Sequence, residues 1–139
     1  MGTRSRVAVM HGDVCKSVYC HYDGYLEYTG QILNEHYNSV LANELISRGD
    51  NSGVKETPAD MNFYSERGET DVGWQVAHTF EEFLEQVENC GAEYYYIMSD
   101  EVWYVGAVYA VSGLIKGGLV PLTEALAQNT IEHLVAEYE

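Results

Sequence analysis

The N-terminal part of the chain has a pattern of hydrophobic and polar positions that predicts a β-hairpin. Residues 4–11 and 14–21 are both rich in β-favouring side chains, and the polar dipeptide Gly12-Asp13 separates them. A short polar break that contains glycine, placed between two such segments, is typical of a tight turn between antiparallel strands. We therefore expect the chain to begin with two paired strands.

Hydrophobic residues at steps of three and four positions predict three amphipathic helices. The first covers residues 30–48, or begins one residue earlier, and is followed by a glycine. The second covers residues 80–90 and follows Thr79, which forms a capping-box pair with Glu82. The third covers residues 122–138, directly after a proline. The positions that we expect on the buried faces of the first two helices are Ile32, Leu33, Tyr37, Val40, Leu41, Leu45, Ile46, Phe80, Phe83, Leu84 and Val87.

A second hairpin is predicted where aromatic and β-branched residues are most frequent. Residues 93–99 and 102–111 flank the polar pair Asp100-Glu101, and this composition suits strands of a half-buried sheet. Weaker patterns over residues 61–64 and 72–78 predict two further strands, after a polar loop that ends near residue 57.

The order of predicted elements is β-β-α-β-α-β-β-α, and it favours an α+β fold. Hairpins dominate this order, so we expect an antiparallel or mixed sheet that consists of the two hairpins and the weak strands. About three helices should pack on one face of that sheet. A length of 139 residues with 46% hydrophobic residues is enough for one core. We therefore expect residues 1–139 to form a single acidic α+β domain.

Net charge is the property of this sequence that indicates most about function. The chain carries 22 acidic and only 7 basic residues, which gives a formal net charge of −15. Residues 1–67 hold 9 acids and 6 bases, whereas residues 68–139 hold 13 acids and 1 base. Charge of one sign repels itself, so it determines partners rather than the fold. It repels nucleic acid and anionic membranes, and it attracts basic protein surfaces. We therefore expect neither direct nucleic-acid binding nor membrane binding.

The cysteines favour a reducing compartment. Cys15, Cys20 and Cys90 are an odd number, and the first two have opposite parity along one predicted strand, so their side chains should point to opposite faces. A disulfide framework is therefore not expected. No apolar run approaches the ~20 residues of a membrane helix, and the N-terminus lacks the apolar core of a signal peptide. We expect a cytoplasmic protein.

One segment gathers side chains that could carry chemistry. Cys20, His21, Asp23 and Tyr25 lie close together in the sequence, where the second strand leads into the first helix. They could form a ligand pocket at the helix N-terminus, with the thiol as a nucleophile. Adjacent strand residues point to opposite faces, however, so Cys20 and His21 should not meet without a bulge. The structural alternative is that Asp23 and the following glycine only make the turn between strand and helix.

Metal and nucleotide sites are not expected. The side chains that zinc could use are His11, Cys15, Cys20, His21 and His78. A C-x₄-C spacing along a strand does not bring two thiolates to one ion. The glutamates of the second helix lack the loop ligands and turn glycine of a calcium site. The glycines around Lys116 lack the spacing of a phosphate-binding loop. The sequence predicts no metal site and no cofactor.

The N-terminal part resembles a family of small uncharacterised proteins encoded by bacteriophages. The resemblance rests on Met-Gly-Thr-Arg-Ser at residues 1–5, on Tyr-Cys-His-Tyr-Asp-Gly-Tyr at residues 19–25, and on Glu-His-Tyr at residues 35–37. This chain departs from the family pattern at Tyr22, where the family has tryptophan, and at Leu26, where proline is common. The resemblance implies a phage origin and expression in the cytoplasm of a bacterial host. It brings no reaction and no catalytic residue.

The leading hypothesis is a phage-encoded, non-enzymatic interaction protein. A compact anion can occupy a basic groove that has evolved for a phosphate backbone. We therefore expect a counter-defence or host-takeover inhibitor, of the anti-CRISPR or anti-restriction type, which mimics DNA on a basic nucleic-acid-binding surface of a host protein. The partner-binding residues that we expect are Glu81, Glu82, Glu85, Glu88, Asp100 and Glu101, with Trp103 and Tyr104 as aromatic anchors.

Two alternatives belong to other functional classes. One is a small enzyme or ligand-binding domain whose pocket lies at Cys20, His21 and Asp23. The other is a virion or assembly component. A homodimer is also compatible with the sequence.

Overall fold

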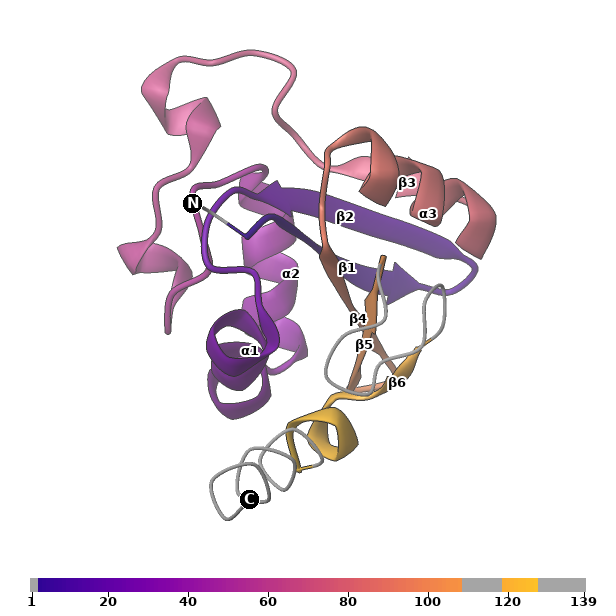
Figure 1. Cartoon of the computed structure of the whole chain (residues 1–139). Helices are drawn as coiled ribbons and strands as arrows, with labels where there is room; N and C mark the ends of the chain where they lie inside the picture. Colours follow the sequence, from indigo (N-terminus) through magenta and orange to yellow (C-terminus); the bar gives the residue numbers. More distant parts are fainter. Residues whose placement is uncertain (1–2, 109–118, 128–139) are drawn as a thin grey trace.

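The computed structural model describes residues 3–108 and 119–127, and its architecture is α+β, with helices packed on a six-stranded mixed sheet (Figure 1). The strand order is β3-β2-β1-β4-β5-β6. Neighbouring strands are antiparallel except for β1 and β4, which are parallel. The strands are β1 (Ser5–His11), β2 (Val14–Cys20), β3 (Gln75–Ala77), β4 (Tyr94–Ser99), β5 (Val102–Ala107) and β6 (Val120–Pro121).

Both predicted hairpins are confirmed. His11 pairs with Val14 at the end of the first hairpin, around the two-residue turn Gly12-Asp13. In the second hairpin, the turn residues Asp100 and Glu101 have φ angles of 50° and 67°. Positive φ at both central residues is the geometry of a type I′ turn, one of the two common two-residue hairpin turns. The last part of the predicted second strand, residues 109–111, lies outside the described residues.

The first predicted helix is wrong as a single element, because the structure divides it. A π-helical turn (Leu26–Gly30) leads into α1 (Gln31–His36), and a break separates α1 from α2 (Ser39–Arg48). After the break, Asn38 caps α2 by accepting a hydrogen bond from the backbone N–H of Leu41 at 3.0 Å.

Burial of Tyr37 explains the break. Its backbone is extended (φ −108°, ψ 104°), and its ring is buried. The Tyr37 hydroxyl donates to the Lys55 carbonyl at 2.8 Å, and the indole N–H of Trp103 donates to the Tyr37 carbonyl at 2.9 Å. Both hydrogen bonds hold Tyr37 in the core, where its extended backbone interrupts the helix. On α2, after the break, Val40 is 73% exposed rather than on the buried face.

The two weak strand predictions fared differently. Residues 61–64 do not form a strand. Residues 61–63 lie between two short 3₁₀ helices, Pro58–Asp60 and Tyr64–Arg67, and pair only through one isolated bridge, from Phe63 to Asn51. The alternating pattern there reflects burial of Met61 and Phe63 rather than a ladder. Of residues 72–78, only the three-residue edge strand β3 is formed.

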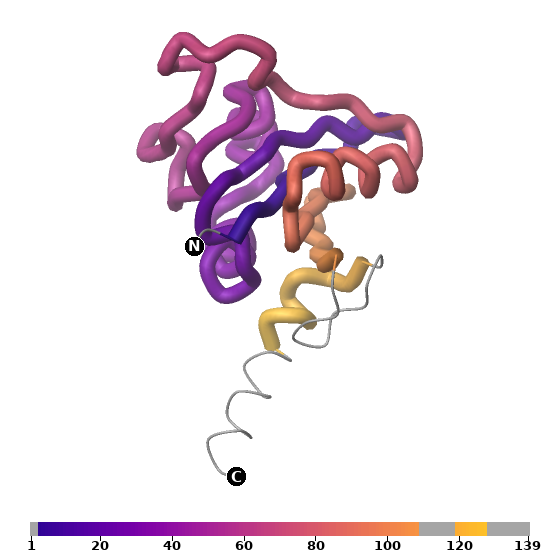
Figure 2. Tube along the Cα trace, turned by 45° about the horizontal axis from the view of Figure 1, so that its top comes forward, coloured from indigo at the N-terminus to yellow at the C-terminus, as the bar shows by residue number. Residues whose placement is uncertain are grey.

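Helices cover both faces of the sheet, so the expectation of one covered face was wrong. Odd-numbered residues of β1, such as Val7, belong to the larger core cluster with α1 and α2. Even-numbered residues, such as Ala8, belong to a second cluster with Phe83 and Val87 of α3 (Phe80–Asn89). Figure 2 shows α2 and α3 on either side of the N-terminal hairpin. We call the side that carries Ala8 the α3 face.

The closing helix is seen in part. Residues 122–127 are helical, and the remainder of the predicted segment, 128–138, lies outside the described residues. Leu122 and Ala125 are buried against the larger cluster. Across 3–108 and 119–127, no helix has both the length and the apolar character needed to cross a bilayer.

Thr79 caps α3, as the sequence predicts. Its side chain accepts from the backbone N–H of Glu82 at 3.1 Å. We expect Thr79→Ala to lower the free energy of unfolding by about 1 kcal/mol, the usual effect of losing such a cap. Urea unfolding followed by circular dichroism measures it, with Thr70→Ala in an exposed loop as the matched control. Equal stability of the two variants would show that the cap contributes nothing.

Candidate interaction site: an acidic edge beside an apolar pocket

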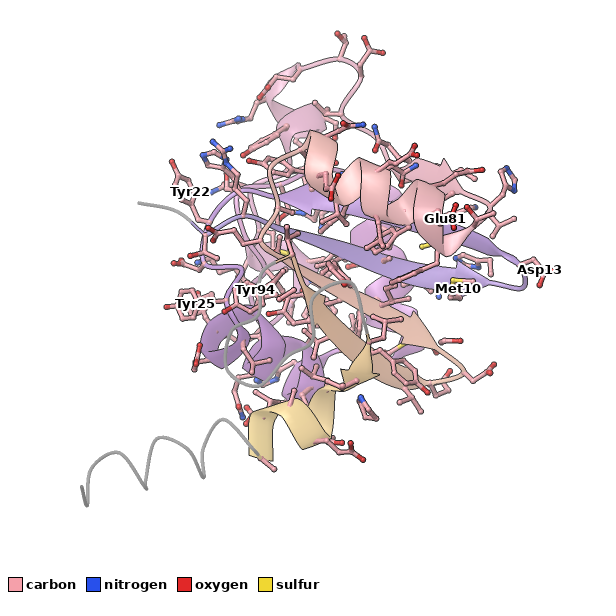
Figure 3. The ribbon with its side chains drawn as sticks, turned by 45° about the vertical axis from the view of Figure 1, so that its right-hand side comes forward. Met10, Asp13, Tyr22, Tyr25, Glu81 and Tyr94 are labelled. Atoms are coloured by element: carbon pink, nitrogen blue, oxygen red, sulfur yellow. The ribbon has the colours of Figure 1, made fainter. Side chains whose placement is uncertain are left out.

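The topology of the sheet gathers carboxylates at one end of the molecule. Since β1 and β4 are parallel and Val9 is level with Met98, the turns that follow both strands lie at the same end of the sheet. The chain of β3 also ends there, because Ala77 pairs with Cys15, and α3 begins three residues later. We define the acidic edge as the carboxylates that these three segments carry, namely Asp13, Glu81, Asp100 and Glu101. Figure 3 shows Asp13 and Glu81 at this end.

The acidic edge has no cationic partner in the described part of the chain. Its four carboxylates belong to exposed residues. The ion pairs within residues 3–108 and 119–127 join His36 to Glu35, Arg48 to Glu66 and Arg67 to Glu69, all elsewhere. These charges therefore act on solvent and on an approaching partner, rather than being neutralised by cations among the described residues.

The exposed side of α3 extends this charge along one line. Glu81, Glu85 and Glu88 are spaced at i, i+4 and i+7, so they share one face of the helix. We call these three residues the α3 stripe. Like charges at this spacing are mildly destabilising, and burial of Phe83 and Val87 on the other face offsets the cost.

Glu82 differs from the other predicted glutamates because it has a structural task. Its Oε2 accepts from the backbone N–H of His78 at 3.0 Å, while its own N–H is bound by Thr79. This is the reciprocal arrangement of a capping box, shifted by one residue. A charge-reversal test of the surface should therefore leave Glu82 unchanged.

An apolar pocket of about 390 Å³ lies beside the acidic edge. It exists because α3 begins at Phe80 and leaves the ends of β1 and β4 uncovered on the α3 face. Its apolar lining consists of Met10, Cys15, Ala77, Phe80, Phe83, Ile97 and Leu119. Its polar lining consists of Asp13, His78, Thr79, Ser99 and Tyr104.

The two aromatic anchors predicted from the sequence have different positions. Trp103 is only 6% exposed and belongs to the larger core cluster. Its burial on the face opposite α3 contradicts the idea that it anchors a partner. Tyr104, its neighbour, points to the α3 face, is half-buried and lines the apolar pocket.

The predicted ligand pocket around Cys20 does not assemble as a reactive site. Cys20 is fully buried in the larger cluster, and burial raises the pKa of its thiol to about 12. His21 lies outside the core, where its Nδ1 bonds the hydroxyl of Tyr19 and its ring contacts Tyr22 edge-on. The thiol and the imidazole are therefore separated, as their opposite parity predicts, and Cys20 is not an available nucleophile.

Asp23 and Tyr25 belong to the turn into the first helix. Asp23 adopts a positive φ of 57°, and its carbonyl accepts from the Thr29 hydroxyl at 2.6 Å. The next residue, Gly24, packs so closely that an added Cβ would lie 2.5 Å from the Cβ of Ser5. This geometry supports the structural alternative, in which Asp23 and Gly24 make the turn between strand and helix. In Figure 3 Tyr25 lies at the opposite end of the sheet from Asp13 and Glu81.

The three free thiols differ in burial, and they should therefore differ in their rates of alkylation. The pKa of Cys15 is raised to about 11 and that of Cys20 to about 12, in both cases chiefly by burial, whereas Cys90 is half-buried. We expect iodoacetamide at about pH 8 to alkylate Cys90 at least ~100-fold faster than the other two, because the thiolate is the nucleophile. Peptide mass spectrometry measures the rates. Equal labelling in the native state would contradict the packing around β2, and equal labelling only in urea is the control.

A second, polar pocket of about 300 Å³ contains a buried arginine. Arg6 is 2% exposed, and its guanidinium donates to the Ser17 hydroxyl at 2.7 Å and to Gln75 Oε1 at 2.8 Å. Asp50 lines the same pocket and accepts from the backbone N–H of Tyr19. Burial raises the pKa of Asp50, while Arg6 and the Tyr19 bond oppose that rise. These bonds connect β1, β2 and β3, which is a structural role.

Sequence reasoning missed Asp13 and the apolar pocket. Asp13 appeared only as a turn residue, and nothing in the sequence states that β1 and β4 are parallel neighbours. The exposure of Phe80 and Leu119, at 38% and 39%, is the signal that marks the pocket once the fold is known. Within the part of the chain described here, no three histidine, cysteine or acidic side chains are placed to hold one metal ion. Searches among protein-family models, curated proteins and solved structures find no match to this chain.

Proposed function

We propose that this chain is a phage-encoded, non-enzymatic interaction protein that binds a basic, nucleic-acid-binding surface of a host protein. The observation that carries the proposal is the acidic edge. Its carboxylates come from three separate segments, are exposed, and have no cationic partner among residues 3–108 and 119–127. Such a field draws in basic surfaces and repels nucleic acid itself.

The spacing of the carboxylates supports an imitation of phosphate. Along an α-helix, Glu81 and Glu85 differ by about 6 Å in height, since each residue rises 1.5 Å. One strand of DNA carries a charge every ~3.4 Å. The α3 stripe alone therefore has roughly half the linear charge density of a strand, and the other carboxylates of the acidic edge add to it.

The class of host protein follows from the same charge. CRISPR effectors, restriction enzymes, other nucleases and RNA polymerase all expose basic grooves for phosphate backbones. A phage protein that fills such a groove would act as an anti-CRISPR or anti-restriction inhibitor, in the cytoplasm of the bacterial host. We place the contact on the acidic edge, the α3 stripe and Tyr104.

The experiment that tests the proposal is a pull-down from bacterial lysate at about 0.05 M and about 0.5 M salt, read by mass spectrometry. We expect a nucleic-acid enzyme to be enriched at low salt and lost at high salt, because screening shortens the reach of exposed charges. Added duplex DNA should displace the same enzyme. Enrichment of a partner that neither salt nor DNA displaces would overturn the proposal.

A further inference from the structure

The apolar pocket and the acidic edge form one continuous surface. Asp13 belongs to both, Glu81 follows the pocket residue Phe80 in the chain, and Asp100 follows the pocket residue Ser99. Figure 3 shows Met10, which lines the pocket, at the same end of the sheet as Asp13 and Glu81. Whatever enters the pocket therefore passes carboxylates at its mouth.

The walls of the pocket favour an apolar occupant. Phe83 and Ile97 are buried at its inner side, while Phe80 and Leu119 are left 38% and 39% exposed at its opening. Large apolar side chains exposed together beside a concave surface are typical of an interaction site. An aromatic ring that entered would cover them, and Phe80 already makes ring contacts with Phe83 and Tyr95 that a further ring would extend.

The carboxylates at the mouth of the pocket determine which residues of the partner can flank that aromatic ring. An acidic neighbour at the mouth would be repelled, and a neutral one would gain nothing from the field, whereas lysine or arginine beside the ring would be attracted. An apolar centre surrounded by a charged rim is also the usual anatomy of a protein interface, where buried aromatic side chains contribute most of the affinity.

We propose that the pocket receives one aromatic side chain that the partner presents between basic residues. This inference rests on the proposed function and adds to it the chemistry of the contact. The ring lies against Phe80 and Ile97, and the flanking cations lie against Asp13, Glu81 and Asp100. The carboxylates thus favour basic surfaces as a class. The pocket then selects, among basic surfaces, one that presents an aromatic side chain.

Three capped pentapeptides test the inference on the intact protein. One has tryptophan between two pairs of lysines, the second has glycine in its place, and the third has tryptophan between two pairs of glutamates. Binding is followed through the methyl NMR signals of Met10 and Ile97 at low salt. We expect the lysine–tryptophan peptide to bind at least about ten-fold more tightly than either of the others, which corresponds to ~1.4 kcal/mol, and to shift both methyl signals.

The outcomes separate this inference from the proposed function. If the lysine–glycine peptide binds as tightly as the lysine–tryptophan peptide, the pocket is not used, and the charge-based function stands. If neither lysine peptide binds, both fail. If tryptamine alone binds as tightly as the lysine–tryptophan peptide, the pocket is a small-molecule site and docking of a partner side chain is overturned.

A variant gives an independent check of the site. Ser99→Phe places a ring at the pocket without changing the charge of the acidic edge, and Ser52→Phe, at another half-buried serine outside the pocket, is the matched control. We expect only Ser99→Phe to remove the preference for tryptophan over glycine. An unchanged preference in a folded Ser99→Phe protein would overturn the placement of the ring.

Discussion

Replacing Glu81 and Glu85 with lysine should weaken binding of the host partner by about 100-fold at low salt. Each substitution removes an attraction and creates a repulsion, and ~1.4 kcal/mol for each position amounts to this factor. Both residues are exposed and take no part in the ion pairs of the described residues, so the fold should tolerate them. Surface plasmon resonance with the captured partner measures the affinity.

A matched pair of substitutions distinguishes local charge from net charge. Glu44→Lys with Glu56→Lys changes the net charge by the same amount at positions away from the acidic edge. Glu44 lies on α2, and Glu56 follows Lys55, whose carbonyl accepts a hydrogen bond from Tyr37 of the larger core cluster. We expect this control to weaken binding less than about three-fold at the same salt, because charges away from the contact act on the partner only at longer range, where screening reduces their effect most. Equal losses in the two variants would show that the acidic edge has no special role.

The largest effect on stability should come from Trp103→Ala. The indole is 6% exposed in the larger core cluster, and its N–H binds the Tyr37 carbonyl at 2.9 Å. We expect the free energy of unfolding to fall by about 3–5 kcal/mol, the usual range for truncating a buried aromatic side chain. Urea unfolding measures the loss, which is a large part of the ~5–15 kcal/mol that holds a small domain folded.

The other tryptophan is the control for this experiment. Trp74 is 45% exposed on the segment before β3 and contacts Lys16 across its ring. Trp74→Ala should cost less than about 1 kcal/mol, as is usual for surface substitutions. If the two alanine variants lost equal stability, the assignment of Trp103 to the core would be wrong. Trp103→Phe should be intermediate, because it keeps a ring but leaves the Tyr37 carbonyl without its donor.

Local patterns predicted the elements with local causes. The hairpin around Gly12-Asp13 and the cap of α3 by Thr79 both depend on residues a few positions apart, and both are confirmed. The division of the first helix could not be predicted in this way. It depends on Tyr37, whose partners Lys55 and Trp103 are 18 and 66 residues away.

The candidate site depends on long-range pairing in the same manner. Sequence reasoning identified Glu81, Asp100 and Glu101 as exposed acids, but it could not bring them to one end of the sheet with Asp13. Parallel pairing of β1 with β4 does so, and the two strands are more than eighty residues apart in the chain. Burial of Trp103 was missed for a related reason, because strand parity gives two faces without saying which helices cover each one.

Competition with DNA tests the central claim most directly. A fluorescently labelled DNA duplex is bound to the purified partner, and the protein is added while the anisotropy of the label is followed. We predict that one equivalent displaces the duplex, since the acidic edge and the phosphates occupy the same basic surface, and that the Glu81→Lys, Glu85→Lys variant does not displace it. An anisotropy that stays high or rises while the protein binds would show a ternary complex, and it would contradict the account.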